Sequence, residues 1–325
     1  MQSEVRKRLL DAFTNSDEEF LSGQYLAELI GCSRTAVWKH MEDLRKEGFE
    51  LEAVRRKGYR IVKVPEKITD NEIRLGLTTK RLGQQIHYEE SVHSTQAIAL
   101  KLSMDGAPEG TIVIAEEQTS GRGRLNREWH SAKYTGIWMS ILLRPNLLPQ
   151  QAPQLTLITA VAVVQAIEEL TPLLPQIKWP NDILINGKKI TGILTELQAE
   201  SDRINSVTIG IGINVNQDSF PPELESIASS LLIEGGEKVN RARLIQTLLT
   251  KLETLYDLYL KEGFYPIKLL WEGYAVTIGK KITARMLKET IEGKAIGITD
   301  DGVLLLEDDK GVIHSIYSAD IELQN

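Results

Sequence analysis

Hydrophobic positions recur at helical spacing through the beginning of the chain. The pattern predicts helices over 3–14 and Ser22–Ile30, followed by a break at Gly31. A third helix is predicted over Ser33–Lys46, where the serine is the N-cap and Gly48 is the stop. Two helices, a short turn that contains glycine and a third helix with polar residues at its start match a helix-turn-helix.

The third helix divides its side chains between two faces. Val37, Met41 and Leu44 fall at i, i+4 and i+7, so we expect them to pack inward. The polar and aromatic residues near its start then point elsewhere, where they suit base edges in a DNA groove. These predicted contacts are Ser33, Arg34, Thr35, Trp38 and Lys39.

Two short strands are predicted next, over Phe49–Val54 and Tyr59–Val64, and they complete the layout of a winged helix. The turn between the strands is cationic, which suits phosphates. Its predicted DNA contacts are Arg55, Arg56 and Lys57. Residues 1–64 are therefore predicted to bind DNA. The alternative is an ordinary helical subdomain with a solvated run of charges.

Strand-like and helical patterns alternate from about residue 86 to 270, which predicts a mixed α/β domain with one main sheet. The predicted strands are Thr111–Ala115, Ile137–Leu143, Gln176–Trp179 and Val207–Val215. The predicted helices are Ser94–Met104, Leu155–Leu170 and Arg241–Lys261. We expect a domain boundary at Pro65–Lys67 and a short helix over Thr69–Gly76 that leads into this domain.

Short alternating strands follow from Tyr274 to the end, separated by turns at Asp300–Gly302 and Asp308–Gly311. This pattern predicts a small β-barrel without a catalytic cluster. The predicted fold class is therefore α+β, with three domains. Their expected limits are 1–64, 65–270 and 271–325.

The charge of the chain is uneven along its length. Its 325 residues carry a formal net charge of −7, which argues against a protein that coats nucleic acid along its whole length. However, residues 33–63 hold 9 Lys and Arg against 5 Asp and Glu, whereas 65–325 hold 26 against 34. A small basic patch therefore lies near the start of an otherwise acidic protein, and DNA contact is expected from the first domain alone.

Some classes of protein are excluded by what the sequence lacks. The single cysteine, Cys32, excludes an internal disulfide and a zinc site built from cysteines, and the five histidines show no close metal-ligand spacing. The longest apolar stretch, Leu155–Ile167, is too short and too polar to span a bilayer. No signal peptide is visible, so we expect a cytoplasmic protein with no membrane partner.

Two segments of the central domain carry unusual glycines. The loop Gln118–Arg124 follows a strand, and its glycines and two arginines suit a phosphate, although its spacing matches neither a Walker loop nor a dinucleotide fold. The segment Gly210–Asn216 spaces glycines along a strand, which is typical of close approach by a ligand or backbone. A solvated turn or RNA contact for the first segment, and tight helix packing for the second, are the alternatives.

Asn186-Gly187 between two apolar runs predicts a β-hairpin with a two-residue turn. In a regular register residue 185 pairs with 188 and residue 182 with 191, so alternation puts Leu184, Lys189 and Thr191 on the face of Asp182. Lys189 is thus predicted to lie on the side of Asp182. The alternatives are a surface lysine and an aspartate that caps a turn.

Taken with the winged helix, these segments resemble the biotin protein ligase family, in particular the bifunctional ligases that also repress the biotin operon. The resemblance covers nearly the whole chain. It rests on Ser94-Thr95-Gln96, Gln118 with GRGR, WPND with the following lysine, GIGINVN, and a C-terminal domain similar to the SH3-like domain of this family.

The resemblance implies an ATP-dependent enzyme that activates biotin with MgATP to biotinyl-5′-AMP and pyrophosphate. The biotin is then transferred to a lysine of the biotin carboxyl carrier domain of a biotin-dependent carboxylase, such as acetyl-CoA carboxylase. The implied biotin-binding residues are Ser94, Thr95, Gln96, Gln118, Arg122, Gly123, Arg124, Lys189 and Gly192. Lys189, Arg122 and Arg124 are also the implied catalytic residues, and Asp182 and Asn214 are implied to lie near the nucleotide or metal.

The chemistry suits these residues because the biotin carboxylate and the α-phosphate of ATP are both anions. Cations from Lys189, Arg122, Arg124 and the Mg²⁺ that accompanies ATP reduce their repulsion, so no metal tightly bound by the protein is expected. Biotinyl-AMP is also the implied corepressor. By ordering loops near Arg122 and 214–226, it would favour a homodimer that brings two winged helices to operator DNA.

Two other functions share parts of this pattern. A lipoate- or octanoate-type acyl-protein ligase has a related catalytic fold, but GRGR, WPND with its lysine, and the winged helix favour biotin. A ligand-sensing transcription regulator without turnover would share the DNA-binding domain. The presence of Lys189 and both loop arginines argues against that regulator.

Overall fold

The computed structural model describes residues 1–325 except 1–4, 6–7, 11, 14–15, 17, 47–48, 64–67, 201 and 325. Its contacts divide the chain into two compact units, Met1–Leu77 and Thr78–Asn325. The helix stop at Gly48, the strand end at Val64, the boundary at Pro65–Lys67 and parts of the helix over 3–14 lie outside the described residues. The expected domain limits at 64/65 and 270/271 therefore stay predictions.

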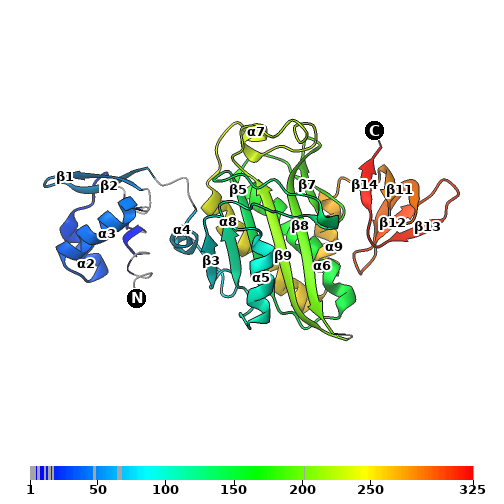
Figure 1. Ribbon diagram of the computed structural model, residues 1–325, viewed down its shortest axis with the longest axis horizontal. Coiled ribbons are helices and arrows are strands. Elements are labelled where there is room, and N and C mark those ends of the chain that lie inside the picture. The colour runs from blue at the N-terminus through cyan, green and yellow to red at the C-terminus, as the bar shows by residue number, and fades with distance from the viewer. Residues whose placement is uncertain are drawn as a thin grey trace. The chain divides into compact units, whose positions relative to one another are not determined.

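The first unit is a helix-turn-helix followed by a two-stranded sheet (Figure 1). Helix α2 (Gly23–Ile30) begins after Ser22, whose side chain accepts a hydrogen bond from a backbone N–H, and ends at Gly31 in the left-handed region. Helix α3 (Arg34–Lys46) and the antiparallel strands β1 (Glu50–Val54) and β2 (Gly58–Lys63) follow. The predicted helix-turn-helix and wing are confirmed over the part of this unit that the structure describes.

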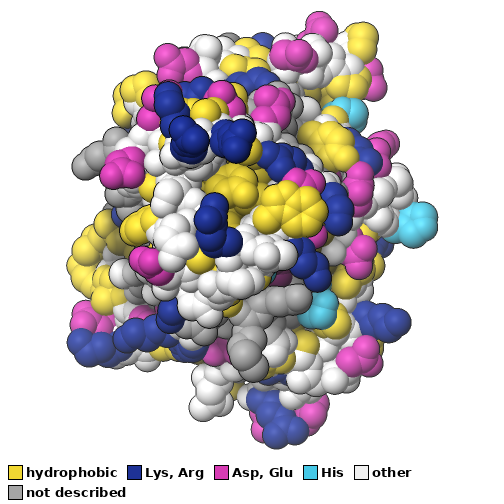
Figure 2. Space-filling view, turned by 90° about the vertical axis from the view of Figure 1, so that its left-hand side faces the viewer, with side chains coloured by type: hydrophobic (Ala, Val, Ile, Leu, Met, Phe, Trp, Pro, Cys, Tyr) yellow, Lys and Arg dark blue, Asp and Glu magenta, His cyan; other side chains and the backbone are white. Residues whose placement is uncertain are grey.

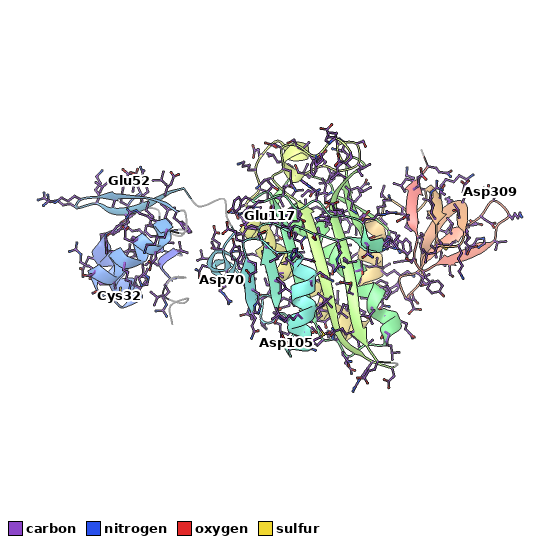
Figure 3. The ribbon with its side chains drawn as sticks, in the orientation of Figure 1. Cys32, Glu52, Asp70, Asp105, Glu117 and Asp309 are labelled. Carbon is purple, nitrogen blue, oxygen red and sulfur yellow. The ribbon has the colours of Figure 1, made fainter. Side chains whose placement is uncertain are left out.

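The face of α3 that the spacing predicted lies in the hydrophobic core of this unit. Val37, Met41 and Leu44 are fully buried, and Cys32 packs partly buried against the same core, at the turn before α3 (Figure 3). The short helix α4 (Asp70–Leu75), with Thr69 in a capping box, also belongs to this unit.

The wing is tied to the beginning of α2 by backbone contacts. Leu21 and Tyr59 exchange two N–H···O=C hydrogen bonds of 2.9 and 2.8 Å. Gly58, at φ +122°, lies so close to Leu21 that an added Cβ would fall 2.0 Å from the Leu21 carbonyl oxygen. Only glycine fits at this position, so Gly58 determines where strand β2 of the wing begins.

The second unit is built on a seven-stranded sheet in the order β3-β4-β5-β9-β8-β7-β6. Strands β3 and β4 are parallel, and every other neighbouring pair of this sheet is antiparallel. The bounds are β3 (Ile86–Glu89), β4 (Ile112–Ala115), β5 (Gly136–Leu143), β6 (Gln176–Lys178), β7 (Asp182–Ile185), β8 (Lys188–Ala199) and β9 (Ile204–Asn214). The mixed α/β domain with one main sheet is thus confirmed.

Helices cover both faces of this sheet (Figure 1). Helix α5 (Thr95–Met104) packs on β4, β5 and β9, whereas α6 (Ala152–Leu170) packs on β8 from the opposite face. Helices α8 (Arg241–Glu262) and α9 (Tyr265–Tyr274) pack on α6, which explains why α6 is apolar almost all round. In the described part of the chain, no helix is long and apolar enough to cross a membrane.

Helix α8 also anchors the beginning of the second unit. The buried carboxylate of Glu253 accepts hydrogen bonds from the backbone N–H groups of Lys80, Arg81 and Leu82, at 2.6, 2.8 and 2.9 Å. Burial raises the pKa of Glu253, but the three donors outweigh it, and the net pKa lies below its ordinary value.

The last part of the chain forms a five-stranded sheet in the order β13-β12-β11-β10-β14. Its strands are β10 (Lys281–Arg285), β11 (Thr290–Ile298), β12 (Leu304–Glu307), β13 (Ile313–Ile316) and β14 (Asp320–Leu323). Gly302 and Gly311 have positive φ in the two predicted turns. The overall α+β class is therefore confirmed, whereas closure of this sheet into an SH3-like barrel stays a prediction.

Candidate functional site

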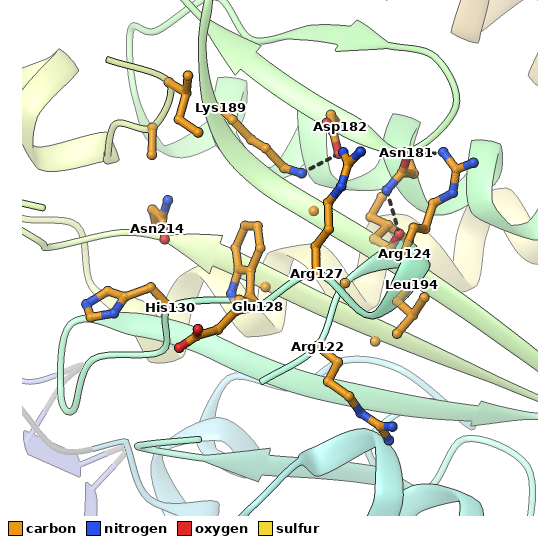
Figure 4. Close-up of a pocket in the computed structure, with 18 of the residues that line it drawn as sticks. Arg122, Arg124, Arg127, Glu128, His130, Asn181, Asp182, Lys189, Leu194 and Asn214 are labelled. Carbon is orange, nitrogen blue, oxygen red and sulfur yellow. Dashed lines mark hydrogen bonds and ion pairs between the residues drawn. The ribbon is translucent and has the colours of Figure 1, made fainter. Parts of the chain in front are cut away.

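A pocket of about 570 Å³ opens above the main sheet, on the face that carries α5 (Figure 4). Three segments enclose it: the arginine loop (residues 121–128), the lid (residues 217–230) and strand β14. All the predicted small-molecule contacts are among its lining residues. They are Ser94, Thr95, Gln96, Gln118, Arg122, Gly123, Arg124, Asp182, Lys189, Gly192 and Asn214.

A buried polar network forms part of the wall. The Gln118 Oε1 atom accepts from the Thr95 backbone N–H at 2.9 Å and from its hydroxyl at 3.1 Å, while Gln118 Nε2 donates to Ser131 Oγ at 3.0 Å. Thr95 also contacts the Ser140 hydroxyl at 2.9 Å. Ser94 precedes α5 but its buried side chain makes no capping bond to the helix. The network fixes donors and acceptors around a small polar ligand.

Gln96 is oriented toward the sheet backbone. Its Nε2 donates to the Thr208 carbonyl at 3.1 Å, and its Oε1 accepts from Ser140 Oγ at 3.0 Å. An added Cβ at Gly210 would fall 2.8 Å from Gln96 Oε1, so this glycine makes room for the amide. The first glycine of the GIGINVN segment therefore packs against a helix side chain.

The β7–β8 hairpin departs from its predicted register. The pairs Ile185–Lys188 and Leu184–Lys189 are as predicted, but Ile183 then lies opposite Thr191 and Asp182 opposite Gly192. The prediction of Thr191 on the face of Asp182 is therefore wrong. A β-bulge at the buried Ile190 adds one residue to β8, and it moves Gly192 to that face.

Lys189 lies on the side of Asp182, as predicted. Its Nζ is 2.7 Å from Asp182 Oδ1 (Figure 4). The same atom lies 5.3 Å from the centre of the Trp129 ring. The indole covers the two glycines beneath it. A Cβ added at Gly192 would fall 2.9 Å from the Trp129 ring, and one added at Gly212 would fall 2.4 Å from the Nε1 atom of that ring. Both glycines thus leave the space that the indole occupies beside Lys189.

Arg124 connects the arginine loop to two other parts of the pocket. Its guanidinium donates to Asn181 Oδ1 at 3.0 Å and to Ser318 Oγ at 2.7 Å. Burial lowers the pKa of Arg124, while the nearby Asp182 and Asp320 carboxylates act in the opposite direction. The neighbouring Arg127 forms an ion pair with Asp320, at the start of β14.

Arg122 differs from the other predicted cations. Its side chain is exposed and is directed away from Lys189 and Asp182 (Figure 4). Lys189 and Arg124 therefore line one pocket, whereas Arg122 does not reach the Lys189–Asp182 pair.

Several lining residues were missed by the sequence analysis. Trp129 and Arg127 follow the GRGR motif within five residues, and an aromatic ring beside an arginine-rich loop was the signal available for them. The lid residues Phe220 and Ala228, and Glu322 of β14, come from segments without such a signal. They reach the pocket only through the folding of distant parts of the chain.

No metal centre is evident in the part of the chain that the structure describes. Within it, no group of three or more His, Cys, Asp or Glu side chains could hold a metal ion. Of the histidines, His130 lines the pocket, whereas His93 lies outside it and contacts the Thr119 hydroxyl at 3.1 Å. Asn214 accepts from Gln217 Nε2 at 3.0 Å, and Asp182 pairs with Lys189.

The first unit presents the predicted DNA contacts on its surface. Arg34, Thr35, Trp38 and Lys39 are exposed. Trp38 is 54 % exposed, although large aromatic side chains are usually buried for the most part. In Figure 2, which faces the left-hand side of Figure 1, Lys and Arg side chains surround exposed hydrophobic ones. Ser33 differs from its neighbours, because its hydroxyl accepts from the Ala36 N–H at 3.2 Å and caps α3.

The cations of the wing are all exposed but differ in their contacts with Phe20. Arg55, Arg56 and Lys57 are all exposed, and Arg56 has a positive φ of 68° at the turn. The Lys57 ammonium lies 5.6 Å from the centre of the Phe20 ring, and the Arg60 guanidinium lies 4.8 Å from the same ring. Phe20 therefore supports the base of the wing.

Comparisons with known protein families match all three parts of the chain. The biotin/lipoate A/B protein ligase family matches residues 88–214. The helix-turn-helix domain family matches residues 5–60, and the biotin protein ligase C-terminal domain matches residues 277–324. Each match falls on the part of the chain to which the sequence analysis gave the corresponding role.

Individual proteins are similar to this chain over most or all of its length. The bifunctional ligase/repressor BirA of Bacillus spizizenii and that of Bacillus subtilis are each 57 % identical, over 99 % of this chain and 100 % of theirs. The structure of the Aquifex aeolicus biotin protein ligase in complex with biotin and ATP has a TM-score of 0.64 and 30 % identity. The match covers 74 % of this chain and 99 % of the Aquifex aeolicus chain.

Proposed function

The chain belongs to the biotin protein ligase family, and we propose that it is a bifunctional member that both attaches biotin to protein and represses transcription. The observation that carries the enzymatic part is the pocket in which Lys189, Asp182, Arg124 and Trp129 converge above the sheet. The winged helix with its exposed Trp38 supports the second part.

The reaction has two steps. In the first, an oxygen of the biotin carboxylate attacks the α-phosphorus of ATP, the bond to the β-phosphate oxygen breaks, and biotinyl-5′-AMP and pyrophosphate form. In the second, the neutral ε-amine of an acceptor lysine attacks the acyl carbon. AMP leaves with the bonding electron pair, and the amine loses a proton to solvent as the amide forms. The acceptor is proposed to be a biotin carboxyl carrier domain of a carboxylase.

The cations of the pocket suit the first step, because attack of one anion on another must overcome their repulsion. We assign this role to Lys189 and Arg124, held in place by Asp182 and Asn181 respectively. The exposed position of Arg122 supports a contact that forms only when the arginine loop closes over bound substrates. Mg²⁺ is proposed to arrive with the ATP phosphates, where it would neutralise their charge.

The Thr95–Gln118–Ser131 network supports biotin binding, because it offers fixed donors and acceptors in a buried wall. Ser94, Gln96, Gly123 and Gly192 line the same pocket and stay proposed contacts. Asn214 and Asp182 are proposed to lie near the nucleotide.

The enzymatic proposal is tested by incubating the full chain with ATP, Mg²⁺ and either biotin or lipoate. We expect biotinyl-5′-AMP with biotin, and biotin on an added carrier domain. Acyl-adenylate formed from lipoate in preference to biotin would contradict the assignment. Binding of biotin without any pyrophosphate release would indicate a sensor without turnover.

The repressor part requires that the ligand controls DNA binding. We propose that biotinyl-5′-AMP favours a homodimer, and that the dimer carries two winged helices to an inverted repeat in operator DNA in the cytoplasm. Sedimentation and DNA-binding measurements with and without biotin plus ATP test this. Equal oligomeric state and equal DNA affinity in both conditions would refute the regulatory part and leave the ligase part intact.

A further inference from the structure

The pocket rim beside Lys189 is held by backbone and side-chain contacts that the proposed catalytic mechanism does not use. Residues 225–229, here called the lid edge, run along the beginning of β8. The Lys189 N–H donates to the Ile227 carbonyl at 2.8 Å, and the Ser229 N–H donates to the Lys189 carbonyl at 3.0 Å. Lys189 and Ala228 thus form a parallel bridge. The lid edge and the proposed catalytic lysine share one short piece of sheet.

A single carboxylate fastens the same segment from outside the pocket. Glu234 lies in the short helix α7 (Leu231–Gly235). Its Oε1 accepts from Ser229 Oγ at 2.5 Å, and its Oε2 accepts from Asn186 Nδ2 at 2.6 Å. Asn186 opens the hairpin turn and Ser229 ends the lid edge, so Glu234 joins the lid to the hairpin that carries Lys189.

The base of the lid is pinned separately. Ser230 Oγ donates to the Gln217 carbonyl at 2.6 Å, and Gln217 Nε2 donates to Asn214 Oδ1 at 3.0 Å. The two ends of the lid are therefore held together whether or not Glu234 is present. The lid edge also meets the hairpin through the backbone of Lys189 and through Lys188 Nζ, which donates to the Glu225 carbonyl at 3.0 Å. What Glu234 adds is a side-chain link from Ser229 to Asn186 in the hairpin turn.

We propose that Glu234 is a positioning residue that latches the lid edge onto the hairpin turn, and thereby shapes the wall beside Lys189 and Asp182 where the nucleotide is proposed to lie. The proposal rests on the adenylation function given above. Ser226, Ile227 and Ala228 line the pocket, whereas Glu234 does not, so the carboxylate acts through the lid edge. Hydrogen bonds to an ionised acceptor are roughly twice as strong as neutral ones, which suits a latch.

The test uses the full chain with Glu234→Gln and Asn186→Gly. Glu234→Gln replaces an acceptor oxygen with an NH₂ group, which cannot accept from the two donors Ser229 and Asn186. Asn186→Gly removes the side-chain amide that donates to Glu234, and glycine tolerates the positive φ of 50° at this turn position. Each variant is expected to raise KM for ATP roughly tenfold, the effect of about one charged hydrogen bond, with kcat and KM for biotin little changed. The double variant should be no worse than the more affected single one.

Glu237→Gln is the matched control, because it removes the same charge from an exposed residue just after α7. It should leave both KM values at the parental level. Amide hydrogen exchange in the protein without substrates gives a readout that does not depend on activity. Exchange over residues 225–229 should be faster in Glu234→Gln and unchanged in the control.

An unchanged KM for ATP together with unchanged exchange in Glu234→Gln would overturn the proposal. Equal loss of affinity for biotin and ATP, or a lowered melting temperature that accounts for the change, would also overturn it in favour of a purely structural role. If the parental chain forms no adenylate, the proposed function fails, and the exchange experiment alone decides whether the latch exists.

Discussion

Lys189 and Asp182 form a 2.7 Å ion pair although they are not opposite each other in the hairpin register. Lys189 lies opposite Leu184, and Asp182 lies opposite Gly192, which has no side chain to separate them. The pair therefore depends on a glycine as much as on its two charges, and it orients the ammonium beside the Trp129 ring.

The first prediction concerns the charge of Lys189. Lys189→Ala removes a cation from the pocket where negative charge develops during adenylation. It should cost roughly 3–4 kcal/mol of transition-state stabilisation. The measurement is pyrophosphate release with saturating biotin and ATP. Lys101→Ala, an exposed change on α5, is the control. Adenylate formation by Lys189→Ala at the parental rate would rule out the assigned role.

The second prediction concerns the space under Trp129. Gly212→Ala places a methyl group 2.4–2.9 Å from three atoms of the indole, so the ring must move away from the strand. We expect the rate of adenylation to fall at least tenfold, because the indole that forms part of the pocket wall is displaced. Far-ultraviolet circular dichroism should stay parental, because the change lies on a face covered by a side chain. Gly106→Ala is an unsuitable control, since Gly106 has φ +85°.

A better control for the pocket is Gly273→Ala, because its added Cβ would meet no atom within 4 Å. Gly273 lies in helix α9, away from the lining residues of the pocket. Its substitution should leave the adenylation rate unchanged. A parental rate in both Gly212→Ala and Gly273→Ala would show that the indole position does not matter for the reaction.

The third prediction concerns DNA recognition. Trp38→Ala should weaken binding to the preferred operator by about 1–3 kcal/mol, the range for a lost base contact, and bring it closer to non-specific binding. Arg56→Ala should weaken binding to all sequences and reduce the slope of log K against log salt by about 1. Titrations at several salt concentrations separate the two effects. A change of salt slope in Trp38→Ala with no loss of specificity would contradict its assignment.

The fourth prediction concerns acid stability. The folded pKa of Glu253 lies below the ordinary value of 4.5, so its carboxylate stabilises the fold above that value. This contribution is lost as the pH falls through the lower, folded pKa. Glu253→Gln should therefore cost about 1–3 kcal/mol at neutral pH, because a buried set of donors loses one acceptor. The measurement is the melting temperature of the variant and the parental chain across the acid range.

The difference between the two melting temperatures should narrow as the pH falls below 4.5 and through the lower, folded pKa, because only the parental chain carries this carboxylate. Glu262→Gln, a change at the end of the same helix, provides the comparison. A constant difference over this range would mean that the charge of Glu253 does not contribute.

Much of the fold was predictable because its elements carry local signals. Ser22 and Gly31 delimit α2 by capping chemistry, and the spacing of Val37, Met41 and Leu44 gives the buried face of α3. The predicted strands and helices of the central domain agree with the structure within a few residues. These agreements share one cause, since each signal lies within the element that it defines.

The site was less predictable where it depends on distant contacts. The motifs brought Lys189 and Arg124 into one pocket, but the partners Ser318 and Asp320 come from the end of the chain and carry no signal of their own. Thr191 was placed on the wrong face because alternation assumes a regular ladder, and a β-bulge leaves no mark in the composition. The lid contacts of Glu234 were likewise beyond local reasoning.

The bulge at Ile190 makes the pairing of β8, as well as its composition, a determinant of the pocket. With the same residues in an unbroken ladder, Thr191 would lie opposite Asp182, in the place that Gly192 now occupies beneath the indole. Lys189 and Gly192 are three residues apart, and an odd spacing puts two residues on opposite faces of a regular strand. Their shared face is therefore an effect of the irregular pairing, and an alignment of related chains that reads β8 by simple alternation would assign the wrong residue to the floor of the pocket.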